Sequence, residues 1–210
     1  MDDAIVQAVA NHAEKVLGKE GYNYTCAVVA NCRMLAVELE DGNEKIRPLN
    51  MNALIIAAYL HNISTVEFGF SDHHVKSAEM AVVFLHTLDA PEQLTSHVER
   101  IILDHTNAVA SEAGDAIPFE GRILYDADKI GRLSGLAVVT SLIEFGARYP
   151  NRAVNAEILA AILRHIEERF IDLYQSLNTV PAQHLAKEKF GNSLAFLDGV
   201  IEHLSDATPV

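Results

Sequence analysis

Hydrophobic side chains recur every three to four residues along most of this chain. Between residues 4 and 17 the repeat places apolar side chains on one face and predicts a first helix, which Gly18 and Gly21 end. The same period from Thr25 to about Glu40 predicts a second helix, closed by turn residues at 41–43. Strand-like alternation of apolar and polar residues is absent. The pattern therefore predicts an all-α protein.

One segment, ALIIAAYLHNI at residues 53–63, is almost wholly apolar. A helix without a polar stripe is buried on all sides, so this segment predicts a central helix. Asn50 or Asn52 could cap its beginning, and His61-Asn62 stand at its end.

Helical periodicity continues through the rest of the chain. Helices are predicted over 73–88, 92–106 and 122–147, the last broken near Gly131, with a loop at 110–118. Two long helices, over 155–175 and 181–204, complete the chain. Because neither a repeat nor a linker is visible, we expect a single helical domain over residues 1–210.

Composition and charge narrow the function classes. Half of the 210 residues are hydrophobic and 21% are charged, a balance typical of a folded protein. The formal net charge of −13, without a cluster of Lys and Arg, argues against nucleic-acid binding. The acidic N-terminus and the lack of an apolar run of about 20 residues argue against a secretory signal and a membrane span. Cys26 and Cys32 match no metal or redox motif, so we expect buried thiols in a cytoplasmic protein.

Several side chains able to bind metals stand at predicted helix ends. A lone histidine is more often a surface or hydrogen-bonded core residue, but these share one kind of position: His61, His73, His74, His105, Asp126 and Asp128. Helices that converge in a bundle can bring imidazole and carboxylate groups to one divalent cation, such as Mn, Fe, Ni, Zn or Mg. Such a cation would support hydrolysis of a phosphate ester.

Five ordered segments resemble the HD superfamily of metal-dependent phosphohydrolases, in particular its small bacterial and archaeal members. Residues 53–63 resemble an apolar helix that ends in His-Asp, and HHVKSAEMAVVFL resembles an HHxKSAEIA helix. IILDHTN, LYDADKIGRL and SLNTVPAQHLAKEKF resemble an I-x-x-H segment, a DADxLD segment and a C-terminal Asn-Thr helix. The resemblance implies an HD-type helical bundle that acts on a phosphorylated small molecule such as a nucleotide.

The resemblance also assigns residue roles. His61 would be a metal ligand, Asp126 the late carboxylate ligand and a catalytic residue, and His73 and His105 would lie where two-metal members hold a second ion. Lys76 would steer a substrate phosphate, although a solvated helix face is the simpler interpretation of this lysine. The role of Asp128 is left open.

Three positions depart from the family pattern. Tyr24 stands where a histidine ligand is expected, and a neutral phenol binds cations poorly. Asn62 stands at the catalytic position of the Asp in the His-Asp dyad, and its amide cannot accept a proton from water. Gly131 replaces the last Asp of DADxLD. These changes predict an impaired or rearranged metal site.

Three functional hypotheses follow. The first is a phosphohydrolase whose His61, His73, His105 and Asp126 hold one displaced metal ion. The second is a non-catalytic HD-fold protein that binds a ligand or a partner. The third is a helical scaffold for self-association, which the apolar content permits.

Overall fold

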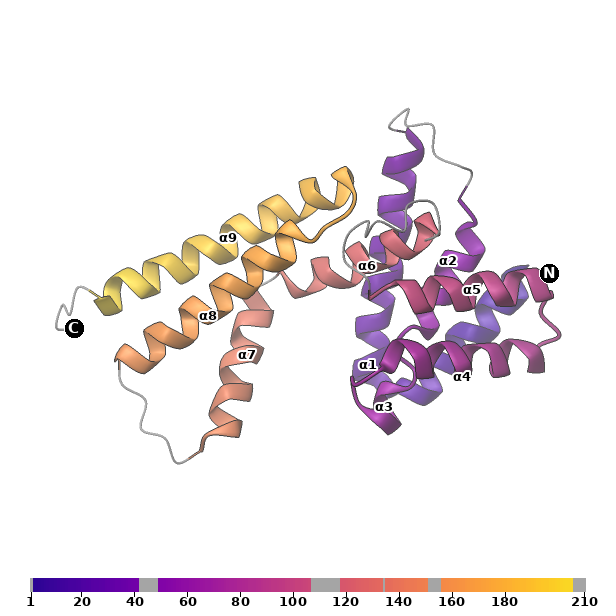
Figure 1. Cartoon of the computed structure of the whole chain (residues 1–210), viewed down its shortest axis with the longest axis horizontal. Helices are drawn as coiled ribbons and strands as arrows, with labels where there is room; N and C mark the ends of the chain where they lie inside the picture. The colour runs from indigo at the N-terminus through magenta and orange to yellow at the C-terminus, as the bar shows by residue number, and fades with distance from the viewer. Residues whose placement is uncertain (1, 42–48, 107–117, 134, 151–155, 206–210) are drawn as a thin grey trace. The chain divides into compact units, whose positions relative to one another are not determined.

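The computed structural model describes residues 2–41, 49–106, 118–133, 135–150 and 156–205 (Figure 1). All regular secondary structure in these ranges is helical, which confirms the all-α prediction. The helices are α1 (Asp2–Asp41), α2 (Met51–Leu60), α3 (Thr65–Phe68), α4 (His73–Thr87), α5 (Glu92–Asp104), α6 (Phe119–Arg132), α7 (Gly135–Arg148), α8 (Ala156–Gln175) and α9 (Val180–Ser205).

These helices form two compact units, residues 1–128 and 129–210. Each is described here by itself, and the expectation of one domain over 1–210 stays a prediction. Among the described helices, none is individually long and apolar enough to span a membrane. Only the pair 51–68 and 73–87, bent by 113°, satisfies such a criterion, by length and composition alone.

Helix α2 is the centre of the first unit. It packs against α1, α4 and α5, and seven of its ten residues are buried, as its lack of a polar stripe predicts. Leu54, Ile56 and Leu60 are fully buried. The Asn50 side chain accepts a hydrogen bond from the Ala53 amide at 3.0 Å and so caps the helix.

Helix α1 is broken at Gly18, as the sequence predicts. This residue has φ 67° and ψ −179°, a conformation that is accessible to glycine and strained for other residues. Gly21, the second predicted terminator, lies inside the helix. The break separates an N-terminal segment from the longer segment that carries Tyr24, and the core positions Cys32 and Leu35 of that segment are fully buried.

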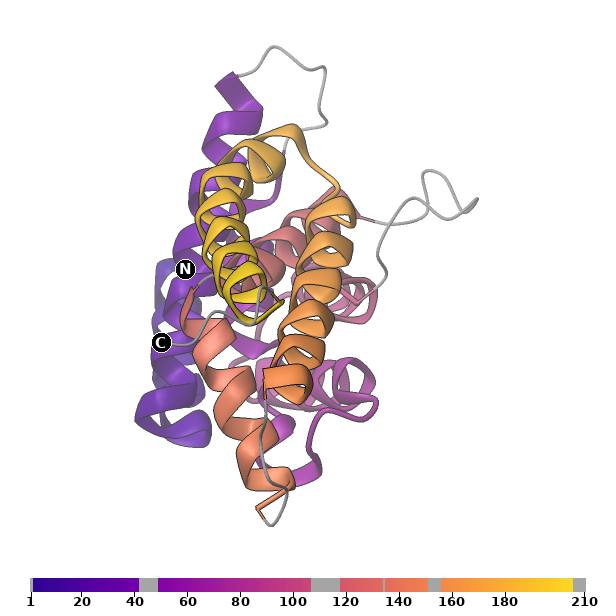
Figure 2. The same cartoon turned by 90° about the vertical axis from the view of Figure 1, so that its left-hand side faces the viewer.

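The second unit contains α7, α8 and α9. Helices α8 and α9 run antiparallel beside each other (Figure 2). Leu163, Ile166 and Phe170 of α8 and Leu197 of α9 are buried, and the rings of Tyr174 and Phe190 stack at 4.9 Å. The break predicted near Gly131 is found between Arg132, where α6 ends, and Gly135, where α7 begins.

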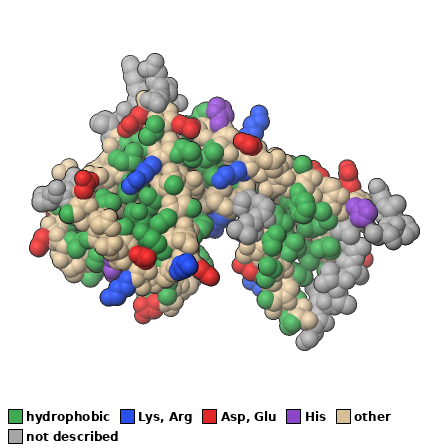
Figure 3. Space-filling view, turned by 180° about the vertical axis from the view of Figure 1, so that it is seen from behind, with side chains coloured by type: hydrophobic (Ala, Val, Ile, Leu, Met, Phe, Trp, Pro, Cys, Tyr) green, Lys and Arg blue, Asp and Glu red, His purple; other side chains and the backbone are tan. Residues whose placement is uncertain are grey.

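Exposed hydrophobic side chains interrupt the polar surface. The space-filling view shows them among scattered acidic and basic side chains (Figure 3). In the first unit, a group at the turn between α3 and α4 includes Val66, Phe68 and Phe70, the last of which is 69% exposed.

Replacement of Gly18 with alanine should destabilise the protein by about 1–3 kcal/mol, because a Cβ makes this backbone conformation strained. A Cβ at Gly18 would meet no atom within 4 Å, so backbone strain alone drives the loss. Urea denaturation measures the free energy of unfolding of the unmodified protein and of each variant. The neighbouring exposed replacement Lys19→Ala should have almost no effect, and equal stabilities for both variants would contradict the strain.

Replacement of Asn50 with alanine should cost about 1 kcal/mol, because the first turn of α2 loses its side-chain acceptor. Asn50→Ser retains a capping oxygen and should restore most of the loss. Thermal unfolding of the three proteins in parallel gives the comparison. Equal midpoints for the alanine and serine variants would show that the cap contributes nothing.

Candidate functional site

Three histidines lie at the ends of helices in the first unit. His61 follows the last residue of α2, His105 follows the last residue of α5, and His73 is the first residue of α4. His61 and His105 are fully buried, and His73 is partly buried. Burial of α2 carries its polar C-terminal end into the interior, where every polar group needs a partner.

The three imidazoles share one hydrogen-bond arrangement. In each, Nδ1 donates to the backbone carbonyl three residues earlier: His61 to Ala58 at 2.7 Å, His73 to Phe70 at 2.9 Å, and His105 to Ile102. A carbonyl oxygen can only accept, so Nδ1 carries the proton and neutral imidazole keeps a lone pair on Nε2. This is the arrangement that orients histidines as metal ligands.

The rings of these histidines lie close together. The ring centroid of His105 is 5.2 Å from that of His61 and 5.5 Å from that of His73, both edge to face. His74 extends the group, since its ring is 5.9 Å from that of His73. Burial lowers the pKa of His105 to about 3 and also lowers the pKa of His73, so both are neutral at neutral pH.

Asn62 binds the lone pair of His61. Its Nδ2 lies 2.8 Å from His61 Nε2 and donates to it. The other end of the amide is unsatisfied: Asn62 Oδ1 is buried and has no hydrogen-bond partner among the described residues. The Asn62 backbone carbonyl is held by Thr65, whose amide and hydroxyl both donate to it.

Tyr24 and Asp128 complete the cluster. The Tyr24 hydroxyl lies 2.5 Å from Asp128 Oδ1, to which it donates, and 3.3 Å from the Asp128 backbone carbonyl. The same Oδ1 is 3.8 Å from His61 Nε2. Asp128 is buried, whereas the Tyr24 side chain reaches the surface and is 36% exposed.

Two serines, which the sequence analysis did not single out, connect the helices that carry His61 and His73. Ser64 Oγ donates to the His73 backbone carbonyl at 3.1 Å, and Ser77 Oγ lies 2.9 Å from Ser64 Oγ. The Ser64 amide also donates to Ser77 Oγ. Serine at a helix end is too common for its sequence position alone to indicate this role.

Asp126, Lys76 and Gly131 are the remaining candidates. Asp126 is fully buried, and its charge, after burial and Asp128, raises the pKa of Cys32. Lys76 places its ammonium 4.5 Å from the centre of the Phe68 ring, a cation–π contact. Gly131 is exposed. The roles predicted for Asp126 and Lys76 stay predictions.

The nitrogen and oxygen atoms of the cluster are of the kinds that bind divalent cations. Imidazole nitrogens and a carboxylate suit Zn, Fe, Ni or Mn, and the unsatisfied Asn62 oxygen is a further donor. As they stand, however, no three His, Cys, Asp or Glu side chains within the described ranges are arranged so that they could hold a metal ion. The bond from Asn62 uses the single lone pair of His61 Nε2, and the bond from Tyr24 uses one lone pair of Asp128 Oδ1.

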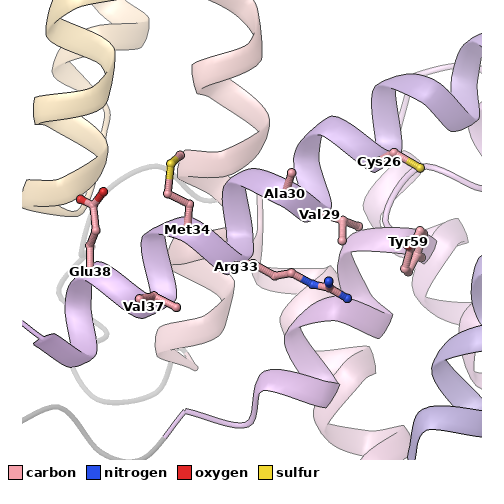
Figure 4. Close-up of a pocket in the computed structure, with 8 residues that line it drawn as sticks. All are labelled: Cys26, Val29, Ala30, Arg33, Met34, Val37, Glu38 and Tyr59. Atoms are coloured by element: carbon pink, nitrogen blue, oxygen red, sulfur yellow. The ribbon is translucent and has the colours of Figure 1, made fainter.

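A separate hollow lies on the α1 side of the same unit (Figure 4). Its volume is about 670 Å³, and its walls are formed by α1 side chains from Cys26 to Glu38 together with Tyr59 of α2. None of the clustered histidines lines it.

Comparison with known proteins identifies the fold. An HD-superfamily hydrolase from Bacillus thuringiensis is 17% identical, with a TM-score of 0.72 over 99% of this chain and 100% of its own. The Lin1889 protein from Listeria innocua is 16% identical, with a TM-score of 0.69 over 98% of both chains. Bacillus subtilis YpgQ, crystallised in complex with ADP, is 15% identical, with a TM-score of 0.69 over 96% of both chains.

No curated protein sequence matches the chain significantly. The model of the HD domain family, however, matches residues 21–133, which is more than half of the chain and includes every residue of the histidine cluster. The chain therefore belongs to the HD domain family.

Proposed function

We propose that this protein is a metal-dependent phosphohydrolase of the HD type, with a rearranged metal site, that acts on a phosphorylated small molecule such as a nucleotide. The observation that carries the proposal is the shared orientation of His61, His73 and His105. Three separate helix ends direct the only protonated nitrogen of each ring to the backbone. Core packing alone does not require three neighbouring imidazoles to keep the same nitrogen unprotonated.

In this proposal the ligands are the three imidazoles and the carboxylate of Asp128. We propose Asp128 for the role that the sequence analysis gave to Asp126, because Asp128 Oδ1 is 3.8 Å from His61 Nε2. Side chains two residues apart on a helix point about 200° apart, so the site that we propose uses Asp128, and the role of Asp126 stays a prediction. A divalent cation supplies a Lewis acid for the phosphoryl oxygen and lowers the pKa of water.

The protein's own residues position these ligands. Backbone carbonyls hold each imidazole ring in its orientation, and the Ser64–Ser77 pair fixes the start of α4 relative to the end of α2. Burial keeps His105 neutral, so its Nε2 does not need to lose a proton before it binds a cation.

Our proposal for the substrate class is based on the fold and on one protein of similar structure. YpgQ from Bacillus subtilis was crystallised with ADP, which supports a nucleotide as the ligand class that we propose for this protein. The formal charge of −13 would repel a free phosphate ester, so a cation would also have to screen the charge of the substrate.

A non-catalytic ligand-binding protein is the second candidate. It is favoured by the two hydrogen bonds that already satisfy His61 Nε2 and Asp128 Oδ1. In this case the histidine cluster would be a buried polar network, and the HD fold would bind its ligand without hydrolysis.

The proposal predicts that Mn²⁺-supplemented protein releases phosphate from a panel of nucleotides and sugar phosphates, and that a chelator abolishes the release. His61→Ala should lower the rate by more than about 100-fold, the scale of losing an outer partner of a ligand, because it removes a ligand itself. His86→Ala, an exposed histidine at the end of α4, is the matched control and should leave the rate unchanged.

Elemental analysis of the same proteins measures bound metal directly. Near-stoichiometric metal that is lost in His61→Ala, together with phosphate release, would support the hydrolase. If ADP raised the melting temperature while neither bound metal nor phosphate release were found, the non-catalytic ligand-binding protein would replace the hydrolase as the proposed function.

A further inference from the structure

The turn between α3 and α4 carries two exposed phenylalanine rings (Figure 1). Phe68 is 46% exposed and Phe70 is 69% exposed, although full burial of such a ring would stabilise the protein by about 1.5–3 kcal/mol. Helix α3 has four residues and buries none of them, so this turn adds little to the core. Together with Val66 and Val75, the two rings form an exposed apolar group of the kind that contacts a ligand or a partner.

Phe70 is held in a fixed position beside His73. Its backbone carbonyl accepts the hydrogen bond from His73 Nδ1 at 2.9 Å, and the two ring centroids are 5.8 Å apart, edge to face. The His73 carbonyl in turn accepts a hydrogen bond from Ser64 Oγ, which connects the turn to the end of α2. Gly69 has φ 71°, so the chain reverses just before Phe70 at a residue without a Cβ. The contacts that orient His73 therefore also orient Phe70.

The exposed ring stands next to the histidine cluster. The ring centroids of Phe70, His73 and His105 follow one another at steps of 5.8 and 5.5 Å. A nucleotide has the matching order of groups, with a flat base at one end and phosphates at the other. A base that lies against Phe70 leaves the phosphates to reach toward the imidazoles.

Charge distinguishes between the occupants that an apolar group can take. Lys76 holds its ammonium 4.5 Å from the centre of the Phe68 ring, which places a positive charge beside this turn for a phosphate to approach. Glu67 and Asp72 are exposed on the same turn and would repel an anionic lipid surface, whereas a base is neutral. The apolar group is also too small to supply the about 800 Å² per partner of a stable protein interface. A nucleotide fits these features best.

We propose that Phe70 is a specificity-determining residue that stacks on the base of a nucleotide whose phosphates point to the histidine cluster. Base–aromatic stacking stabilises a complex by about 1–3 kcal/mol and accepts any base, because every base has a π-face. The protein therefore prefers nucleotides to phosphorylated compounds without an aromatic ring. The inference rests on the proposed function in one respect, the position of the phosphates.

The test is a fluorescence titration with etheno-ADP, a nucleotide with a fluorescent base whose emission is quenched when the base stacks. The protein contains no tryptophan, so its own emission does not interfere. Titration in EDTA prevents hydrolysis of the probe by the proposed activity. The unmodified protein should quench the emission in a saturable way, and absence of quenching both in EDTA and with added Mn²⁺ would overturn the inference.

Two variants separate stacking from general apolar contact. Phe70→Leu keeps an apolar side chain but removes the flat ring, so the dissociation constant for etheno-ADP should rise by about 5- to 150-fold. Phe70→Tyr keeps the ring and should bind the probe as the unmodified protein does. Because Phe70 is exposed, neither variant should change the melting temperature by more than a small amount.

A control residue and a control ligand match these variants. Phe196 of α9 is 58% exposed, and Phe196→Leu should leave the affinity for etheno-ADP unchanged. Inorganic pyrophosphate has no base, so calorimetry should give the same binding to the unmodified protein and to Phe70→Leu. Equal losses of ADP and pyrophosphate binding in Phe70→Leu would show that Phe70 acts by shaping the cluster, contrary to the inference.

The outcomes separate the inference from the proposed function. If Phe70→Leu and the unmodified protein released phosphate from nucleotides and sugar phosphates with the same kcat/KM values, the inference would be wrong and the hydrolase would stand. Loss of etheno-ADP binding in Phe70→Leu alone, without phosphate release from any compound, would support the inference and overturn the hydrolase. A dimer in light scattering that Phe70→Leu dissociates, with unchanged etheno-ADP affinity, would assign this turn to self-association instead.

Discussion

Burial of the apolar helix α2 is the constraint on which the first unit depends. Its side chains pack against α1, α4 and α5, and this packing draws the end of the helix into the interior. His61 and Asn62 stand at that end and cannot reach bulk water, so they must find partners inside the protein. The polar cluster is thus a consequence of core packing as well as of the side chains that take part in it.

The cluster combines three imidazoles, a carboxylate, an amide and a phenol. A carboxylate such as that of Asp128 is costly to bury unless a positive charge or hydrogen-bond donors compensate for it. Members of a metal-dependent family can use a cation for this purpose. In this chain the Tyr24 hydroxyl provides part of the compensation, and the Asn62 amide satisfies the nitrogen next to it.

Tyr24 and Asn62 are linked through the pair of atoms that they contact, Asp128 Oδ1 and His61 Nε2. Tyr24 lies on α1 and Asn62 follows α2, yet their acceptors are adjacent. The unsatisfied oxygen of Asn62 is the part of the network that hydrogen bonding leaves incomplete.

The sequence by itself determined the local features. The 3.6-residue period predicted the helices, Gly18 the break in α1, and the absence of a polar stripe the burial of α2. The helix-end positions of His61, His73 and His105 were also readable. The short helix α3 was not predicted, because four residues are too few to establish a period.

Only the tertiary structure decided which side chains meet: it brought Tyr24 to Asp128, 104 residues away, and it brought Asp128 next to His61. Periodicity assigns a residue to a helix face, but the partner of that face depends on how distant helices pack.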